Sequence, residues 1–497
     1  MDAREYFRQF ADPAEFERIV EKPTVTAMWR DCVAEFPNRD AVVFQGESRT
    51  FARLDDDAAD FRTILSKQTR DGACIGIFSA NSYDFVKVYL AVVTSGRTAV
   101  ILPAHLDAWN VCGCSEMLGL DALVYQPELK EKVALCKTLL IDMTRTSGEK
   151  TDMTVCEEKT PCVMMFTGGT TGKSKCALLS HGAVMQGTVN GCYGVRDVFE
   201  QRYLLVLPLS HVFGLIRNLM TALYTGSTIW ICGNNKNMFR DMQTFKPTVL
   251  VLVPALAEMS LALSKQFGKN MLGDELKYII CGAAPVAPYL IEEYDKIGVK
   301  LLQGYRLTES ANLVSGNPES LRYPASIGFP YPHQEYKTVD GELWIRGKNM
   351  MDGYVGGGET GFDEEGWFHT GDLVRMDERG MFWITGRVKE MIALPTGENI
   401  FPAELETHFN ALPFIQDSQV FEDVAENGKH ILALEVVPRQ TVLSQMELEH
   451  PGEFILQELE KVNRELPSFR RVMRIKVRDS DFERTPSMKI VRYKKCK

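Results

Sequence analysis

The chain has 497 residues, of which 45% are hydrophobic and 25% charged, as is usual for soluble globular proteins. Because single hydrophobic cores stop growing at roughly 250–300 residues, this length predicts more than one domain. The net charge of −10 argues against a nucleic-acid partner. No apolar run reaches the ~18–20 residues of a membrane span, so we expect no transmembrane segment.

The cysteines and the N-terminus bear on location. The first residues lack the basic and apolar regions of a signal peptide. The 12 cysteines are scattered, only Cys112 and Cys114 are close, and no Cys/His group has zinc spacing. We therefore expect a cytoplasmic protein with reduced thiols.

The first 160 residues alternate between helical and strand patterns, which predicts an α/β fold with largely parallel strands. A peripheral helix is expected within residues 1–20, and Thr24 is a candidate cap for the next helix. A hairpin is expected around residues 45–48. The predicted helices are 25–36, 55–65 and 83–94, and the predicted strands are 41–44, 49–51, 74–78, 99–103, 122–125 and 138–142.

A loop of Gly, Thr, Ser and Lys follows the apolar strand 163–166. Such a loop can wrap a polyphosphate, because its glycines let backbone N–H groups approach and its lysines offset charge. A Walker A loop would need glycine five positions before Gly172, where the chain has Thr167. A second strand over 177–179, with the next helix starting only after Ser180, favours a hairpin-like phosphate loop. The alternative is a surface turn with two solvated lysines.

Downstream, strands are predicted at 203–209, 227–232, 248–253, 275–281 and 299–302. Polar or glycine-rich segments follow three of them, at His211, at Gly282 and at residues 305–309. Since ligands gather beyond the carboxyl ends of strands in open α/β sheets, we expect these segments to line a site.

From about residue 325 the pattern changes to short strands of a small barrel or meander. A small α+β unit then follows, with a helix opened by Pro402, strands at 418–421, 430–437 and 473–477, and a helix at 453–466. The predicted fold class is therefore α/β. A large N-terminal domain, residues 1–388, holds α/β subdomains and a small β-barrel-like part, and a small mobile α+β C-terminal domain spans residues 389–497.

Five motifs occur in a fixed order along the chain. In this order the chain resembles the adenylate-forming enzymes, which include acyl-CoA synthetases, peptide-synthetase adenylation domains and firefly luciferase. The resemblance runs from about residue 25 to the end and is nearest to fatty acyl-CoA synthetases. The motifs are Thr167-Gly168-Gly169-Thr170-Thr171-Gly172, Gly304-Tyr305-x-Leu-Thr308-Glu309, His369-Thr370-Gly371-Asp372, Gly386-Arg387-x-Lys389-Glu390 and Thr485-Pro486-x-x-Lys489.

The resemblance implies an ATP-dependent acid–thiol ligase of the AMP-forming acyl-CoA synthetase type. A carboxylic acid, expected to be a fatty acid, attacks the α-phosphate of ATP to give acyl-AMP and pyrophosphate. The thiol of coenzyme A then displaces AMP. Mg²⁺ is the implied metal. An acyl carrier protein in place of CoA is an open alternative that no sequence feature decides.

Matching positions carry the family's residue roles to this chain. Glu309 would hold Mg²⁺ through a hard oxygen and Thr308 would contact phosphate. Asp372 would accept the ribose hydroxyls with help from Arg387, and His211 would lie near the acyl carboxylate. The β- and γ-phosphates would meet Thr167, Gly168, Gly169, Thr170, Thr171, Gly172 and Lys175, and adenine would meet Gly282, Ala283, Gly304 and the ring of Tyr305.

In the small domain, the resemblance makes Lys489 the mobile catalytic lysine, Lys389 the hinge and Gly397 the glycine that lines the pantetheine path. Each role has a structural alternative. Tyr305 could be a core tyrosine, His211 a structural histidine, and Lys489 a solvated charge. Thr308 with Glu309 is also a common pair at helix starts.

Three positions depart from the family pattern. Arg306 replaces a glycine beside the expected α-phosphate, where arginine could bind charge or crowd the adenylate. Cys176 and Met488 also replace glycines. Arg306 favours a third hypothesis, a degenerate protein that only binds acyl-AMP, whereas intact Glu309, Asp372 and Lys489 oppose it.

Overall fold

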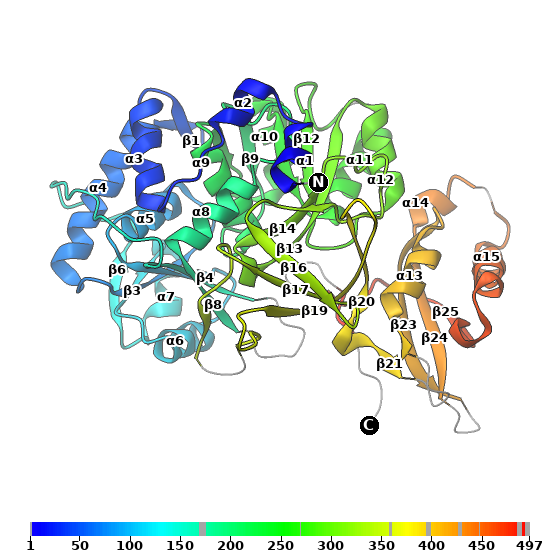
Figure 1. Ribbon diagram of the computed structural model, residues 1–497. Coiled ribbons are helices and arrows are strands. Elements are labelled where there is room, and N and C mark those ends of the chain that lie inside the picture. The colour runs from blue at the N-terminus through cyan, green and yellow to red at the C-terminus, as the bar shows by residue number, and fades with distance from the viewer. Residues whose placement is uncertain are drawn as a thin grey trace.

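The computed structural model describes residues 2–167, 175–268, 270–356, 360–393, 399–425, 430–446, 448–484 and 490–492. Figure 1 shows a larger body, built of two large sheets with helices packed against them, beside a smaller part around β23–β25. This arrangement confirms the predicted α/β fold with a large N-terminal and a smaller C-terminal domain.

The first large sheet has seven strands in the order β18-β8-β7-β4-β3-β5-β6. Strands β7, β4, β3, β5 and β6 run parallel, as the alternation of helices and strands predicts. Strands β8 and β18 extend it antiparallel. Their bounds are β3 Cys74–Ser79, β4 Thr98–Pro103, β5 Ala122–Tyr125, β6 Leu139–Asp142, β7 Pro161–Phe166, β8 Cys176–Ser180 and β18 Gly353–Val355.

The second large sheet has nine strands in the order β15-β14-β13-β12-β11-β9-β10-β1-β2. Its central strands are parallel, and the predicted hairpin of β1 and β2 forms one edge. Their bounds are β1 Asp40–Phe44, β2 Glu47–Thr50, β9 Arg202–Leu205, β10 Thr228–Ile231, β11 Val249–Leu252, β12 Tyr278–Cys281, β13 Lys300–Leu307, β14 Asn312–Asn317 and β15 Phe329–Pro330.

The ends of two strands in this sheet lie several residues from their predicted positions. Strand β9 ends at Leu205 instead of continuing to residue 209. Strand β13 continues to Leu307 instead of ending at residue 302, because its second half pairs antiparallel with β14 after its parallel partner β12 has ended. Tyr305 therefore lies within a strand, not in the loop beyond one.

Helices cover both large sheets (Figure 1). Most predicted helices form, and Thr24 caps α3 as expected, since its hydroxyl accepts the Ala27 N–H at 3.1 Å. Their bounds are α1 Ala3–Arg8, α2 Pro13–Arg18, α3 Val25–Glu35, α4 Phe51–Gln68, α5 Tyr83–Val93, α6 Ala108–Met117, α7 Lys130–Val133, α8 His181–Asn190, α9 Thr221–Tyr224, α10 Met238–Phe245, α11 Pro254–Phe267, α12 Pro288–Lys296, α13 Pro402–Asn410, α14 Gln440–Leu443 and α15 Pro451–Glu465, with a π-helical segment at Phe213–Met220.

The later part of the chain forms smaller sheets. The predicted meander is a four-stranded antiparallel sheet, β16-β17-β19-β20, and the C-terminal unit has a three-stranded sheet, β23-β24-β25, with its own core between Ile400 and Val472. Arg439 of this unit forms an ion pair with Glu258 of α11 at 3.1 Å. The bounds are β16 Gln334–Val339, β17 Glu342–Gly347, β19 Phe368–Met376, β20 Phe382–Arg387, β21 Ile392–Ala393, β22 Asn399–Ile400, β23 Ile415–Val424, β24 His430–Pro438 and β25 Arg474–Val477.

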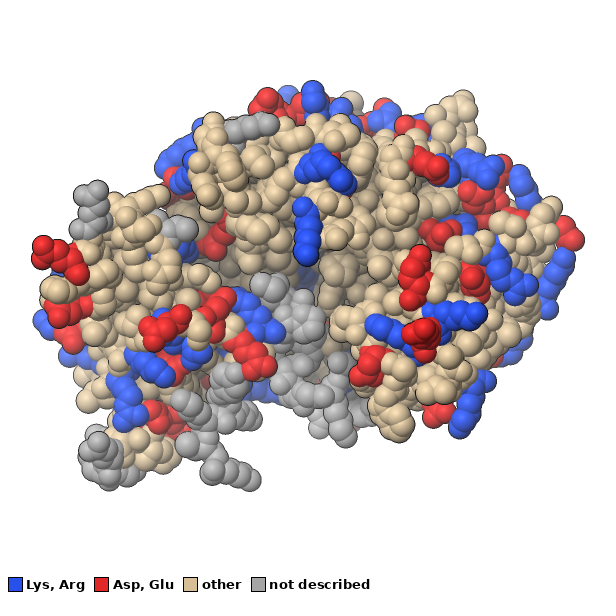
Figure 2. All heavy atoms as spheres, turned by 180° about the vertical axis from the view of Figure 1, so that it is seen from behind, with Lys and Arg blue, Asp and Glu red and all other residues tan. Residues whose placement is uncertain are grey.

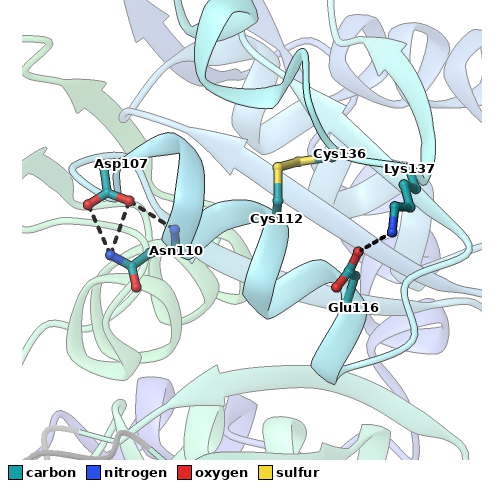
Figure 3. The surroundings of a disulfide bond; sticks show 6 residues. All are labelled: Asp107, Asn110, Cys112, Glu116, Cys136 and Lys137. Carbon is teal, nitrogen blue, oxygen red and sulfur yellow. Dashed lines mark hydrogen bonds and ion pairs between the residues drawn. A yellow bond between two sulfur atoms is a disulfide. The ribbon is translucent and has the colours of Figure 1, made fainter.

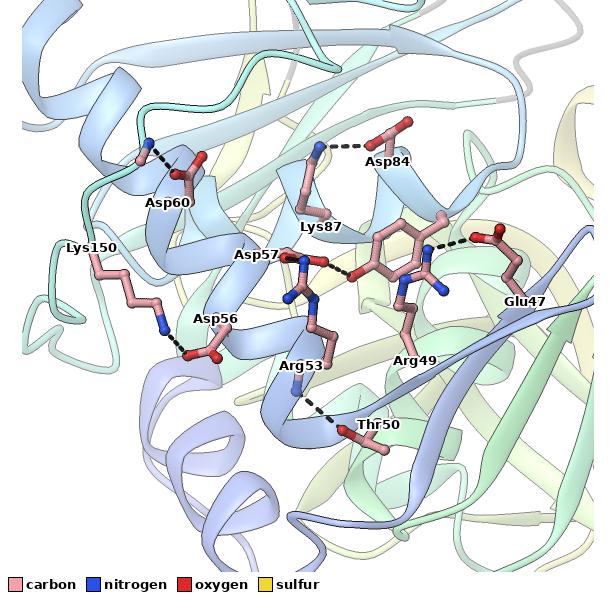
Figure 4. A network of polar contacts seen from close by, with 12 residues as sticks. Glu47, Arg49, Thr50, Arg53, Asp56, Asp57, Asp60, Asp84, Lys87 and Lys150 are labelled. Atoms are coloured by element: carbon pink, nitrogen blue, oxygen red, sulfur yellow. Dashed lines mark hydrogen bonds and ion pairs between the residues drawn. The ribbon is translucent and has the colours of Figure 1, made fainter.

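Polar contacts link the start of α4 to the end of β2 and to α5 (Figure 4). The Thr50 hydroxyl caps α4 by accepting the Arg53 N–H at 3.2 Å. On the next turn, Asp57 accepts the Tyr83 hydroxyl at 2.6 Å, which ties α4 to the start of α5. Burial, followed by the Asp57 contact, raises the pKa of Tyr83, so this hydroxyl stays a donor.

A disulfide joins Cys112 of α6 to Cys136, which follows α7 (Figure 3). The expectation of reduced thiols is therefore wrong for this pair. Spacing did not reveal it, because the chain returns through β5 before it brings the two Cα atoms within 4.8 Å. Closing a loop of 24 residues would contribute roughly 3–4 kcal/mol in the chain-entropy account.

Two further features of the described residues are the distribution of charge on one face and the apolar character of the helices. Acidic and basic side chains are interspersed on the face seen in Figure 2. No described helix combines the length and apolar character that a membrane crossing needs.

His181, the first residue of α8, is fully buried and predicts an acid-sensitive fold. Its Nδ1 accepts the Val25 N–H at 3.3 Å, and burial lowers its pKa to about 4. The unfolded chain binds this proton below pH ~6.5 and the folded chain does not, so stability falls as the pH drops from 6.5 towards 4. The expected contribution is about 2 kcal/mol at pH 5.

Urea unfolding at pH 7 and pH 5 tests this. In His181→Asn, whose amide oxygen can accept the same N–H without titrating, the loss between the two pH values should shrink by about that amount. An unchanged loss would contradict the assignment.

Candidate functional site

The Gly/Thr-rich segment connects two antiparallel strands, as the hairpin prediction requires. Strands β7 and β8 pair Phe166 with Cys176, and the Thr167 N–H donates to the Lys175 carbonyl at 2.8 Å. Strand β8 then leads into α8, which Ser180 caps as predicted. Thr167 and Lys175 thus stand at the base of the loop. The predicted loop residues Gly168, Gly169, Thr170, Thr171 and Gly172 lie outside the described residues.

Beside this base, a carboxylate and an ammonium group meet on one tyrosine. The Tyr354 hydroxyl of β18 donates to Glu309 at 2.6 Å, and the Lys175 ammonium lies 4.5 Å from the centre of the Tyr354 ring. Burial and the neighbouring Glu309 raise the pKa of Tyr354, which keeps its proton in place. Strand β18 pairs with β8, so the sheet itself holds Tyr354 next to the loop.

Glu309 reaches this position through a short turn that directly follows β13. Residues Thr308–Ser310 form a single 3₁₀ turn, and Ala311 after it takes a left-handed conformation with φ 48°. The Glu309 carbonyl accepts the Met351 N–H at 2.8 Å, which fixes the backbone of the turn. The predicted pair Thr308 and Glu309 therefore opens no long helix.

A second cluster forms around the Asp372 carboxylate. Asp372 of β19 faces Arg387 of β20 across the sheet, and the Arg387 Nε donates to it at 2.7 Å. The buried Tyr305 hydroxyl donates to the other carboxylate oxygen. Burial, then Asp372, raises the pKa of Tyr305, and the nearby carboxylates raise that of Arg387 against the opposing effect of burial.

These two clusters lie at the two ends of one short segment. Tyr305 is in β13 and Glu309 is four positions further on, in the turn. The structure thus brings six predicted site residues from separate parts of the chain into one region. They are Thr167, Lys175, Tyr305, Glu309, Asp372 and Arg387.

Gly282 and Arg306 meet at close range on the other face of β13. A Cβ added to Gly282 would lie 2.4 Å from the Arg306 Nη1, so a larger residue there would require the guanidinium to move. Ala283, which follows it, has φ 79°. The Arg306 guanidinium packs on the Phe213 ring, 3.4 Å from its centre. Arg306 lines a cavity together with Phe213 and Arg217, whereas the Tyr305 hydroxyl contacts Asp372.

Other predicted residues lie at the margins of this region. His211 precedes the π-helical segment, and its carbonyl accepts the Leu215 N–H at 2.9 Å. Lys389 is the middle residue of a 3₁₀ turn, Val388–Glu390, between β20 and β21. Gly304 lies in β13, and an added Cβ would lie 2.5 Å from the Ser315 carbonyl oxygen. Gly397 and Lys489 lie outside the described residues.

Tyr354 is the site residue that the sequence did not reveal. It belongs to no motif of the resemblance, and a single tyrosine after a glycine is an ordinary turn pattern. Only the pairing of β18 with β8 shows that it contacts both Lys175 at the base of the loop and Glu309.

The donor set fits a magnesium nucleotide. Mg²⁺ in such sites takes one or two protein carboxylates and keeps water and phosphate oxygens as its other ligands. Glu309 supplies one hard oxygen ligand beside the loop. No group of three or more metal-ligating side chains occurs in the described ranges, so the protein alone builds no closed metal site there.

Comparison with known proteins agrees with this geometry. The AMP-binding enzyme family matches residues 29–355, and the AMP-binding enzyme C-terminal domain matches residues 389–497. The peroxisomal OPC-8:0-CoA ligase 1 of Arabidopsis thaliana is 30% identical over 496 residues, which cover 90% of this chain and 88% of that protein.

Two further similarities concern part of the sequence and the fold. The indoleacetate–CoA ligase of Aromatoleum aromaticum is 33% identical over 297 residues, which cover 56% of this chain and 58% of that protein. The o-succinylbenzoate CoA synthetase of Bacillus subtilis, solved with an acyl-adenylate, superposes with a TM-score of 0.78 at 23% identity, over 95% of this chain and 98% of that one. The latter shows the fold.

Proposed function

Because the chain belongs to the AMP-binding enzyme family, we propose that it activates a carboxylic acid with ATP and transfers the acyl group to coenzyme A. The observation that carries the proposal is the placement of two charged clusters, Asp372 with Arg387 and Glu309 with Lys175, at the two ends of the segment from Tyr305 to Glu309. ATP likewise has two separate polar groups side by side, a ribose and a polyphosphate.

In the proposed arrangement, Asp372 accepts the ribose hydroxyls. Its carboxylate is buried and already oriented by Tyr305 and Arg387. The adenine base lies against Tyr305, Gly282, Ala283 and Gly304. Preorganised polar groups of this kind spend no free energy on reorientation when the ligand binds.

At the other end, the loop from Thr167 to Lys175 surrounds the β- and γ-phosphates. Glu309 and Thr308 face the same phosphates, and Mg²⁺, held by Glu309, would supply positive charge there when bound. Tyr354 donates to Glu309 and so fixes the direction in which its carboxylate points.

The chemistry then has two steps. An oxygen of the acid, held near His211, attacks the α-phosphorus, the bond to the bridging oxygen breaks, and pyrophosphate leaves. Lys489 stabilises the charge that develops at phosphorus. In the second step the CoA sulfur attacks the acyl carbon, its proton is lost, and AMP leaves. We also propose that the large domain ends at residue 388 and the small domain begins at residue 389. Lys389 is then the hinge about which the small domain moves between the two steps.

The acid is not identified by the relatives, since their names give indoleacetate for one and OPC-8:0 for another. A fatty acid, an acyl carrier protein as acceptor, and a cytoplasmic location stay predictions from the sequence.

ATP–pyrophosphate exchange over acids of graded chain length tests the proposal. We expect exchange that depends on both the acid and Mg²⁺, followed by thioester formation with CoA. Exchange without thioester formation, restored by a phosphopantetheine-loaded carrier protein, would change the acceptor. Binding of ATP without any exchange would favour a degenerate nucleotide-binding protein and overturn the proposal.

A further inference from the structure

A small cavity of about 30 Å³ lies behind the strand that carries Tyr305. Gln303 and Gly304 of β13 form part of its wall, together with aromatic rings that include Phe213 and Tyr331. The wall shares β13 with the proposed nucleotide site.

Two arginines from different elements line this cavity, Arg217 of the π-helical segment and Arg306 of β13. Among the described residues that line it, none is acidic. The lining therefore offers neither guanidinium a carboxylate partner. The cavity therefore combines apolar walls with two positive charges and no protein counter-charge.

Arg217 is the more buried of the two, with 3% of its surface exposed. Its Nη1 is buried without a hydrogen-bond partner in the described part of the chain. The nearest polar groups are neutral: the pKa values of Tyr203 and Tyr331 are raised by burial, so both phenols keep their protons beside the arginine. A buried cation that lacks a counter-charge is costly unless a ligand supplies one.

Arg306 lies flat on Phe213, where the ring face stabilises a cation. Burial lowers the pKa of Arg306 to about 9, and the guanidinium is thus still charged at neutral pH. Gly282 leaves it the space it occupies. The residue that departs from the family pattern thus lines the cavity.

We propose that the acid activated by this enzyme carries a second anionic group, and that Arg217 and Arg306 bind it in this cavity. The inference rests on the proposed function. The ligand class is a dicarboxylic acid with a short apolar spacer: one carboxylate reacts with ATP, the spacer contacts the aromatic wall, and the second carboxylate meets the two guanidinium groups. Arginine suits this role because its planar donors match a carboxylate in pairs.

Matched pairs of acids test this inference. Straight-chain monocarboxylic acids and α,ω-dicarboxylic acids of equal carbon number are compared by kcat/KM in ATP–pyrophosphate exchange. We expect the wild type to prefer the dicarboxylic member of the best pair by about 10- to 100-fold, the usual range for one charge-assisted contact. Equal values for both members over the whole series would overturn the inference while leaving the ligase proposal intact.

Variants assign the preference to the arginines. Arg217→Met and Arg306→Met should each lower the ratio of kcat/KM for the dicarboxylic acid to kcat/KM for the monocarboxylic acid by about 10-fold or more. Arg217→Lys should keep part of the preference. Arg464→Met, at an arginine of α15 that is 75% exposed, is the matched control. Equal losses for both acids would instead mean that the arginines hold the reacting carboxylate or the fold.

Calorimetric titration of the same acid pair without ATP gives a second readout that needs no turnover. Dicarboxylate binding that is lost in Arg217→Met supports the inference, and binding unchanged in both methionine variants overturns it. Failure of every acid in the exchange assay would count against the proposed function, and the titration would still decide whether the cavity binds a dianion.

Discussion

Replacing Glu309 with glutamine is expected to lower ATP–pyrophosphate exchange by about 100-fold, with folding intact. Glutamine keeps the shape of the side chain, and its amide oxygen can still accept the Tyr354 hydroxyl that now donates at 2.6 Å. What it loses is the negative charge that would hold Mg²⁺ beside the phosphates.

The measurement is exchange over a range of Mg²⁺ concentrations, and Tyr354→Phe is the control. Phenylalanine keeps the ring next to Lys175 and the carboxylate of Glu309, and removes only the hydroxyl that orients the carboxylate. We expect a smaller loss, about 10-fold, that higher Mg²⁺ concentrations partly restore. If Glu309→Gln exchanges at the wild-type rate at every Mg²⁺ concentration, Glu309 is not the metal ligand.

The second large effect concerns Lys489 and Gly397, both outside the described residues. Attack on the α-phosphorus builds charge that one positioned donor stabilises by about 10²–10³ in rate. Thiol attack on the acyl carbon needs no such cation but needs a narrow path, which a glycine leaves open. Lys489→Ala should therefore abolish acyl-AMP formation and still convert supplied acyl-AMP and CoA to thioester, whereas Gly397→Leu should do the reverse.

Each half-reaction is measured separately, together with thermal unfolding. A Pro at Lys389, within the 3₁₀ turn Val388–Glu390, should slow the second half by restricting the hinge. Parallel losses of both halves in Lys489→Ala and in Gly397→Leu would refute the alternating use of the small domain. A loss of stability in Gly397→Leu that accompanies both losses would make Gly397 a turn glycine.

Local patterns predicted most elements well. The hairpin of β7 and β8, the Ser180 cap and the parallel strands β3 to β6 follow from apolar runs, glycines and capping residues that lie next to each other in the chain. Boundaries were less accurate where a partner strand from elsewhere decided them. Strand β13 continues past its predicted end because β14 pairs with its second half.

The sequence by itself determined the family, the enzyme class and the approximate order of the elements. The five ordered motifs are defined by residue type and spacing alone, so they can be recognised without knowing how the chain packs. The family models that match residues 29–355 and 389–497 confirm the family, and the CoA-ligase relatives confirm an acid–CoA ligase class.

Only the tertiary structure decided which side chains share a site. Tyr354 contacts Glu309 because its strand, β18, pairs with β8. Cys112 bonds Cys136 after the chain has passed through β5. Arg217 and Arg306 line one cavity. The physical reason is that such contacts depend on which strands become neighbours and on the face to which each residue points. The spacing of residues far apart in the chain does not show which strands become neighbours. The proposed anion cavity therefore could not be predicted from the motifs.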